Sequence, residues 1–344
     1  MTIQDGRALL AALVGTVLGK DRTAGAMTGL ALADSLFTDA APERVEGGMI
    51  AMALNIVLFA ELLDRVPTAR RWVMAERAAG RGRTLDHGAV RTIRFPAGGT
   101  GALPGGADAF ARILRPLGYR VAESYPLPRL HMTGHAFRHQ SLPAEVPQFF
   151  VSELHVAQFD AEFGESAARL FGTSRDPIDP ATQAVLALLE RRGWLSLAQA
   201  QGLLPVIAAA FSRSHDLPAL ADYALLKSRS AEAAWIATEG NAFNHATERV
   251  SDVDAVARRL RQLDYPVKAA VEHSASGRVH QTAFRADPVL RGFRDHDGAV
   301  VDREVPGSFY EFITRDIDPA TGRIDLAFDS GNATGIFAVT RAAA

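Results

Sequence analysis

The chain has 344 residues, with 37 lysines and arginines against 39 aspartates and glutamates, ten histidines and no cysteine. Without cysteine there is no disulfide framework, thiolate-bound metal cluster or thiol nucleophile, so any metal must be held by imidazole and carboxylate groups. The charge balance lacks the basic excess that nucleic acids and anionic membranes attract, and we expect neither as a partner.

The N-terminal stretch predicts neither a membrane span nor an export signal. Residues 8–19 are apolar but too short to cross a bilayer, and Asp5 stands where an export signal carries basic residues. We therefore expect a cytoplasmic protein, and the sequence does not predict its oligomeric state.

The first part of the chain changes from a helical to a strand-rich pattern. Residues 1–80 repeat apolar side chains every three or four positions, which predicts an N-terminal helical region. Residues 84–160 predict a first strand-containing module, in which a helix starts near Asp108 and strands occupy 90–95, 119–125 and 149–156.

The second part repeats this alternation. Residues 165–236 are rich in alanine and leucine and predict a helical insertion, which is divided into short helices by Pro177, Pro180, Pro205 and Pro218. The strand pattern returns over 240–340 and predicts a second module. We interpret residues 1–344 as a single enzyme domain.

An internal repeat relates the two modules. Residues 108–121 (DAFARILRPLGYRV) align without gaps to residues 254–267 (DAVARRLRQLDYPV), with nine identities in fourteen positions. Each copy predicts an Asp-capped helix that turns into a strand, and each follows a segment with a histidine, His87 or His245. We predict an α+β fold with a sheet core of two related strand-helix-strand modules. Composition alone could also produce two similar Ala/Arg/Leu helices.

The segment from Asp86 to Arg91 carries the first candidate site. On a strand, His87 and Arg91 face the same side, about 13 Å apart along the backbone. A metal on His87 and the guanidinium of Arg91 could hold a small carboxylate between them, because an arginine fork matches a carboxylate. The alternative is a partly buried histidine with a surface arginine.

Two further segments offer a histidine and a carboxylate. His245 lies among small and polar residues, and Glu311 lies in an aromatic strand. A carboxylate buried there needs a cation, either a metal or Arg315. Two histidines and one carboxylate on separate strands could form a facial triad for Fe(II), but spacing alone does not single out these three.

Other histidines give weaker candidates. His131, His135 and His139 are four residues apart and would align on a helix, but on a strand they spread over more than about 25 Å. His155, two residues after Glu153 on a predicted strand, is a further but weaker candidate for a metal ligand.

Four segments together resemble the 2-oxoadipate dioxygenase/decarboxylase family. They are His87-Gly-Ala-Val-Arg91, Phe243-Asn-His245, Phe309-Tyr-Glu311 and the closing run FDSGNATGIF that starts at Phe328. The resemblance implies a core similar to the vicinal-oxygen-chelate fold and one Fe(II) ion held by His87, His245 and Glu311.

The resemblance also implies an activity. Proteins of this family convert 2-oxoadipate and O2 to 2-hydroxyglutarate and CO2 in lysine catabolism, and this chain would act on 2-oxoadipate or a closely similar 2-oxo acid. Arg91 would then be the catalytic residue that binds a substrate carboxylate, and Gly331 and Asn332 would approach the substrate through their turn.

Two other interpretations stay open from the sequence. The same metal site could serve a lyase, isomerase or hydrolase acting on a small carboxylate, since related folds host unrelated chemistry. A non-catalytic binding protein could also keep the fold, with Glu311 paired to Arg315.

Overall fold

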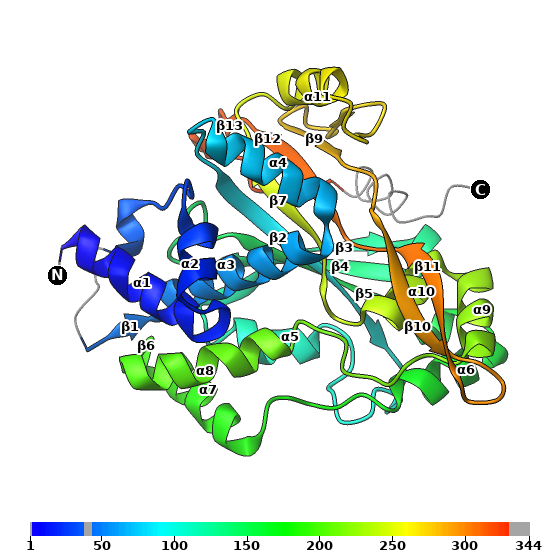
Figure 1. Cartoon of the computed structure of the whole chain (residues 1–344). Helices are drawn as coiled ribbons and strands as arrows, with labels where there is room; N and C mark the ends of the chain where they lie inside the picture. The colour runs from blue at the N-terminus through cyan, green and yellow to red at the C-terminus, as the bar shows by residue number, and fades with distance from the viewer. Residues whose placement is uncertain (1, 38–42, 330–344) are drawn as a thin grey trace.

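A mixed sheet of eight strands forms the centre of the computed structural model, which describes residues 2–37 and 43–329. The strand order is β3-β4-β5-β2-β7-β12-β9-β8 (Figure 1). At its centre, β2 (Thr84–Arg94) and β7 (Phe243–Arg249) run antiparallel. Both are buried along nearly their whole length, as expected for strands that are covered on both faces.

The two halves of the sheet have the same connectivity. In the first half, β2 is followed by the helix α5 (Asp108–Leu114) and the strands β3 (Tyr119–Leu127), β4 (Met132–His139) and β5 (Gln148–His155). In the second half, β7 is followed by α11 (Val253–Gln262), β8 (Glu272–His273), β9 (Val279–Ala283) and β12 (Phe309–Arg315). In each half the first strand pairs parallel with the last. The predicted α+β core of two related modules is confirmed.

The second module departs from the predicted repeat after its helix. β3 runs for nine residues in the first module. The corresponding segment of the second module forms an isolated bridge between Val267 and Phe284 before the two-residue β8. Pro266 stands where the first module has Arg120, and proline has no N–H for a strand ladder. The prediction is therefore right for the helix and wrong for the strand of the second copy.

Helices and one hairpin are inserted into this core. The helices between the modules are α6 (Ala161–Phe171), α7 (Pro180–Arg192), α8 (Leu197–Ala209), α9 (Leu220–Arg229) and α10 (Ala231–Glu239). The hairpin of β10 (Pro288–Arg294) and β11 (Val300–Pro306) precedes β12. Pro180 begins α7, but the predicted break at Pro205 is wrong. It lies inside α8, whose buried Leu203, Leu204 and Ile207 hold the helix across the lost hydrogen bond.

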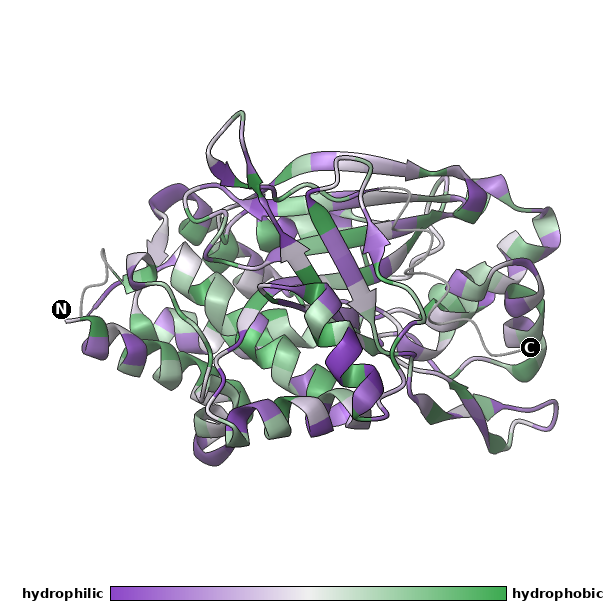
Figure 2. Cartoon of the chain, turned by 90° about the horizontal axis from the view of Figure 1, so that it is seen from above, coloured by the Kyte–Doolittle hydropathy of each residue, from purple (hydrophilic) through white to green (hydrophobic). Residues whose placement is uncertain are grey.

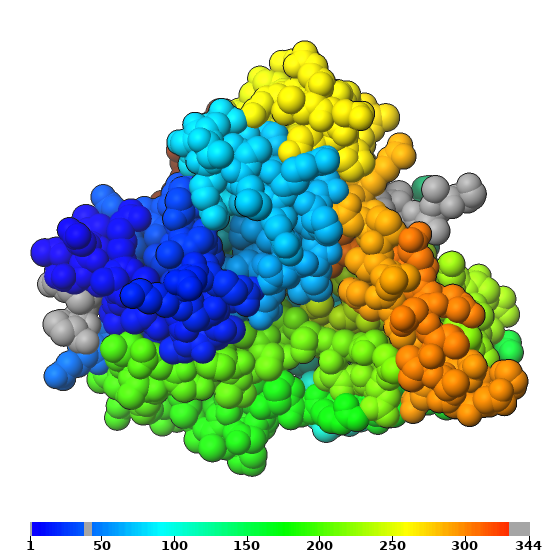
Figure 3. Space-filling model, in the orientation of Figure 1, coloured from blue at the N-terminus to red at the C-terminus, as the bar shows by residue number. Residues whose placement is uncertain are grey.

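The predicted N-terminal helical region is also confirmed. It contains α1 (Ile3–Leu18), α2 (Lys20–Met27), α3 (Gly47–Arg65) and α4 (Pro67–Ala78). Thr2 and Asp5 form a reciprocal capping box that starts α1. α1 packs on α3 and on α8, so the blue N-terminal segment lies against the green helices in Figure 3.

Among the described residues, α3 is the helix that is long and apolar enough to cross a bilayer, judged by length and composition. However, 78% of its most apolar window is buried inside the molecule. Asn55 on this helix donates to the hydroxyl of Tyr119 at 3.0 Å, which ties α3 to β3. Figure 2 shows hydrophobic residues on the central strands and on the helices that cover them, and α3 is one of these core helices.

Gly88 is required by the close packing of β2 against β7. A Cβ atom at this position would lie 2.2 Å from Cζ of Phe243. We expect Gly88→Ala to lower the free energy of unfolding by about 1–3 kcal/mol, because the ring and both strands must shift. Urea denaturation measures the change. Gly164→Ala on α6 is the control, since its new methyl group would come no closer than 3.8 Å to Val156. Equal stability of the two variants would contradict this packing.

Candidate metal centre

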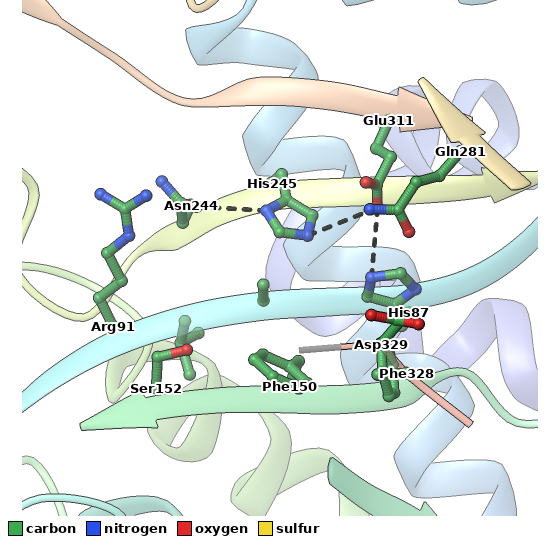
Figure 4. Close-up of a pocket in the computed structure, with 12 residues that line it drawn as sticks. His87, Arg91, Phe150, Ser152, Asn244, His245, Gln281, Glu311, Phe328 and Asp329 are labelled. Atoms are coloured by element: carbon green, nitrogen blue, oxygen red, sulfur yellow. Dashed lines mark hydrogen bonds and ion pairs between the residues drawn. The ribbon is translucent and has the colours of Figure 1, made fainter. Parts of the chain in front are cut away.

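Three side chains from neighbouring strands meet in a buried pocket (Figure 4). His87 comes from β2, His245 from β7 and Glu311 from β12. Oε2 of Glu311 lies 3.4 Å from Nε2 of His87 and 3.7 Å from Nε2 of His245. One potential ligand atom of each residue lies within 4.8 Å of the others. Sequence spacing left these residues among several candidates, and the strand order β2-β7-β12 brings them together.

Each histidine follows a residue that is extra in the pairing of β2 with β7. Asp86 is extra on β2, and Asn244 is extra on β7. Such bulges re-aim side chains. Asp86 accepts a hydrogen bond from Nδ1 of His87 at 2.8 Å, and Asn244 accepts one from Nδ1 of His245 at 3.2 Å. Both rings therefore turn Nε2 toward Glu311, in the tautomer that a metal ligand requires.

The electrostatics of the pocket favour a neutral His245 and an ionised Glu311. For His87, burial lowers the pKa, but Asp86 and Glu311 outweigh it and raise the pKa above its usual value. Burial lowers the pKa of His245 to about 3, so its imidazole is neutral. Burial opposes ionisation of Glu311, but its contacts with His87, His245 and Thr247 lower the pKa of this carboxyl group. The Thr247 hydroxyl donates to Glu311 at 2.6 Å. An ionised carboxylate beside a neutral imidazole is the state in which both bind metals.

Asp86, the partner of His87, is itself held by two arginines. Its carboxylate accepts from Nε of Arg315 at 2.9 Å and from Nε of Arg249 at 2.7 Å. Burial would raise the pKa of Asp86, but Arg315, His87 and Arg249 together hold it well below its usual value. Arg315 therefore pairs with Asp86. The alternative in which it neutralises Glu311 is wrong.

The three residues fit a metal ion. Oε1 of Glu311 is buried and has no hydrogen-bond partner among residues 2–37 and 43–329. A carboxylate oxygen left in this state is costly, and a cation beside it would remove the cost. Two imidazole nitrogens and one carboxylate on one side are the donor set of centres that keep positions open for substrates.

The pocket beside these residues has an aromatic wall. In the first module Phe150 pairs with Ala89, two residues after His87. Glu311 in the second module pairs with Thr247, two residues after His245, so Phe150 occupies the position equivalent to Glu311. The ring of Phe328 lies 4.8 Å from those of His87 and Phe150. The wall supplies no fourth protein ligand and leaves that side to small molecules. The remaining lining residues are Val90, Arg91, Ser152, Asn244, Gln281 and Asp329.

Arg91 lines the same pocket, and Figure 4 shows it at the end away from Glu311. Its side chain is 1% exposed, and Nη1 lies 2.6 Å from Oε2 of the equally buried Glu232 in the first turn of α10. Trp235, one turn further along α10, lies under the guanidinium at 5.0 Å and donates to the carbonyl of Gly307 ahead of β12. The alternative of a surface arginine is therefore wrong.

The other predicted candidates lie elsewhere. His135 and His139 are on β4 and His131 precedes it, so the three form no helical row. His135 and His155 approach Glu153 at 3.6 and 3.9 Å, but no three-residue metal group includes them in the described part of the chain. Gly331 and Asn332 lie outside the described residues.

Sequence reasoning missed the residues that support the site. These are Asp86, Asn244, Thr247 and Glu232. A signal existed for the first two, because each is the polar residue directly before a candidate histidine. The sequence carries no such signal for Glu232, since this residue is far from Arg91 along the chain.

The sheet of two related modules, with this group on its central strands, defines a protein of the vicinal-oxygen-chelate class with a candidate metal centre. A protein assigned to the glyoxalase superfamily from Ralstonia eutropha JMP134 has a similar structure, with a TM-score of 0.89 and 48% identity. The match covers 94% of this chain and 98% of that one.

The chain belongs to the 2-oxoadipate dioxygenase/decarboxylase family, whose model matches residues 56–324. A 2-oxoadipate dioxygenase/decarboxylase from Mycobacterium bovis (strain ATCC BAA-935 / AF2122/97) is 30% identical over 227 residues. The match covers 62% of this chain and 53% of the relative, so the chain spans about half the length of the curated relatives it matches. The expected family is confirmed.

A hydroxyglutarate synthase from Oryza sativa, solved in complex with 2-oxoadipate, shares the fold. Its TM-score is 0.65 at 21% identity, over 88% of this chain and 96% of that one. At this identity the likeness concerns the fold alone. The expected vicinal-oxygen-chelate-like architecture is confirmed.

Proposed function

We propose that the chain is an Fe(II)-dependent dioxygenase that decarboxylates 2-oxoadipate, or a closely similar 2-oxo acid, to 2-hydroxyglutarate and CO2. The observation that carries the proposal is the convergence of His87, His245 and Glu311 in one pocket with Arg91, in a chain of this family. The reaction balances without a further reductant. The carboxylate next to the keto group leaves as CO2. One oxygen atom of O2 enters the new carboxylate, and the other enters the new hydroxyl group.

His87, His245 and Glu311 are the proposed metal ligands. Bound there, Fe(II) supplies the Lewis acidity and the electrons for the reaction between a 2-oxo acid and O2. The protein prepares this centre through Asp86 and Asn244, which orient the imidazoles by their Nδ1 atoms. Thr247 orients Glu311 by donating to its Oε2.

Arg91 is the proposed partner of a substrate carboxylate. It lies four residues beyond His87 on β2, which suits a short dicarboxylic acid whose 2-oxo end lies at the metal centre. Glu232 and Trp235 hold the guanidinium from the side of α10, so little conformational entropy is lost when it binds substrate. Phe150 and Phe328 keep water from the reacting end.

Oxygen uptake tests the proposal. Protein reconstituted with Fe(II) should consume O2 when 2-oxoadipate is added, and should form CO2 and 2-hydroxyglutarate in amounts equal to the oxygen consumed. Adipate, which lacks the 2-oxo group, is the matched control and should give no uptake. Conversion of 2-oxoadipate without oxygen consumption would show a lyase, isomerase or hydrolase instead.

A further inference from the structure

A second cleft lies where several helices end, and it shares no residue with the pocket at the metal centre. Its volume is about 490 Å3. It is lined by α2, by the C-terminal ends of α3 and α10, by the segment after α8 and by β10. Four arginines face it, and they are Arg22, Arg65, Arg213 and Arg291.

Two of these arginines are neutralised within the cleft. Arg22 pairs with Asp64 at the end of α3. Arg291 on β10 makes two hydrogen bonds, both 2.7 Å long, with the carboxylate of Glu239 at the end of α10. These pairs account for two cations and two anions, so they leave no net charge.

The other two arginines have no carboxylate oxygen within 4.0 Å in the part of the chain that the structure describes. Arg65 donates to the backbone carbonyl groups of Glu61 and Phe243 at 3.3 and 3.4 Å, and its buried Nε has no hydrogen-bond partner among the described residues. Arg213 is half-buried. Burial lowers the pKa of both guanidinium groups, which shows that holding these charges is costly.

Three features of the cleft compensate the arginines in part. The charge of Glu239 raises the pKa of both guanidinium groups and so opposes the effect of burial. The carbonyl ends of α3 and α10 favour cations, but such partial charges are weaker than a bound anion. Glu61 also lines the cleft. Burial raises the pKa of Glu61 and so disfavours its charged form, although Arg65 opposes this effect.

We propose that this cleft binds a small oxyanion, the phosphate or carboxylate group of a metabolite, between Arg65 and Arg213. Guanidinium groups present paired N–H donors that match an oxyanion, and two of them lining one cleft provide charge and geometry together. The cleft is a binding site of its own, because neither arginine reaches the pocket of Arg91.

Calorimetric titration of the full chain with inorganic phosphate, and separately with succinate, tests the proposal. Wild-type protein should bind at least one of them saturably at low ionic strength, and Arg213→Gln should weaken that binding by about tenfold or more. Tighter binding of phosphate would indicate a phosphate ester as the ligand, and tighter binding of succinate a carboxylate.

Two variants with matched chemistry locate the binding. Arg285→Gln removes an exposed charge outside the cleft, and Arg91→Lys alters the metal-centre pocket. Arg285→Gln should bind both anions as wild type does, and Arg91→Lys should keep the binding that Arg213→Gln loses. The proposal is wrong if neither anion binds, if Arg213→Gln binds as wild type does, or if Arg91→Lys alone loses binding. Arg213 makes no hydrogen bond that its replacement would break in the described structure, and circular dichroism checks that the variant is folded.

Discussion

Replacing His87, His245 or Glu311 by alanine, one at a time, should lower bound iron from close to one ion per chain to about a tenth of that or less. Each change leaves two protein ligands. Replacing only a residue that supports a ligand lowers metal affinity by roughly 10–100-fold, and removing the ligand itself should lower the affinity further. Glu311→Ala should have the largest effect, since it removes the one negative charge among the three ligands. Metal analysis after reconstitution with Fe(II) and gel filtration measures the content.

His155→Ala is the matched control for these variants. His155 is also a histidine near a sheet carboxylate, but its Nε2 contacts Thr133 at 2.8 Å and it lies outside the group of three. Its replacement should leave the iron content unchanged. If all three ligand variants kept near-stoichiometric iron while remaining folded by circular dichroism, the metal centre would lie elsewhere.

Arg91→Lys should keep the iron and lose most of the substrate affinity. Lysine can still pair with Glu232, so the buried carboxylate stays neutralised, but an ammonium group cannot offer the fork that holds a carboxylate by two hydrogen bonds. We expect KM for 2-oxoadipate to rise by about tenfold or more, which corresponds to the loss of one charge-assisted hydrogen bond. Steady-state oxygen uptake measures the kinetics, and metal analysis of the same sample shows that the centre is intact.

Arg94→Lys makes the same chemical change three residues further along β2. Arg94 is partly exposed and pairs with Glu153 and Asp108. None of these three residues lines the pocket. This variant should have normal kinetics. Equal KM values for wild type and Arg91→Lys would refute the role of Arg91 as a carboxylate partner.

The residues that orient the two histidines could not be predicted from the sequence. Asp86 and Asn244 are visible as polar residues before the two histidines, but their contact with Nδ1 depends on irregularities in the pairing of β2 with β7. A strand pattern places adjacent residues on opposite faces, and only a bulge overrides that rule. The sequence therefore predicted the histidines without their partners.

The carboxylate of the metal centre could not be identified from local sequence spacing either. Glu153 and Glu311 both lie on buried strands with a histidine or arginine nearby, and local spacing could not rank them. β12 pairs with β7 and places Glu311 against both imidazoles, whereas Glu153 is engaged by Arg94 and by the backbone N–H of Ala107. That difference arises from strand order.

By itself the sequence determined the absence of thiol ligands, the alternation of helical and strand-rich regions, and the internal repeat that marks two modules. These features follow from residue types and from short-range geometry, in which side-chain periods of two and 3.6 separate strand from helix. Tertiary structure alone decided that Arg315 would neutralise Asp86, that Glu232 would reach Arg91, and that Glu311 would stand between two histidines. Each of these contacts joins distant segments through strand order, register and helix packing, which a local pattern does not specify.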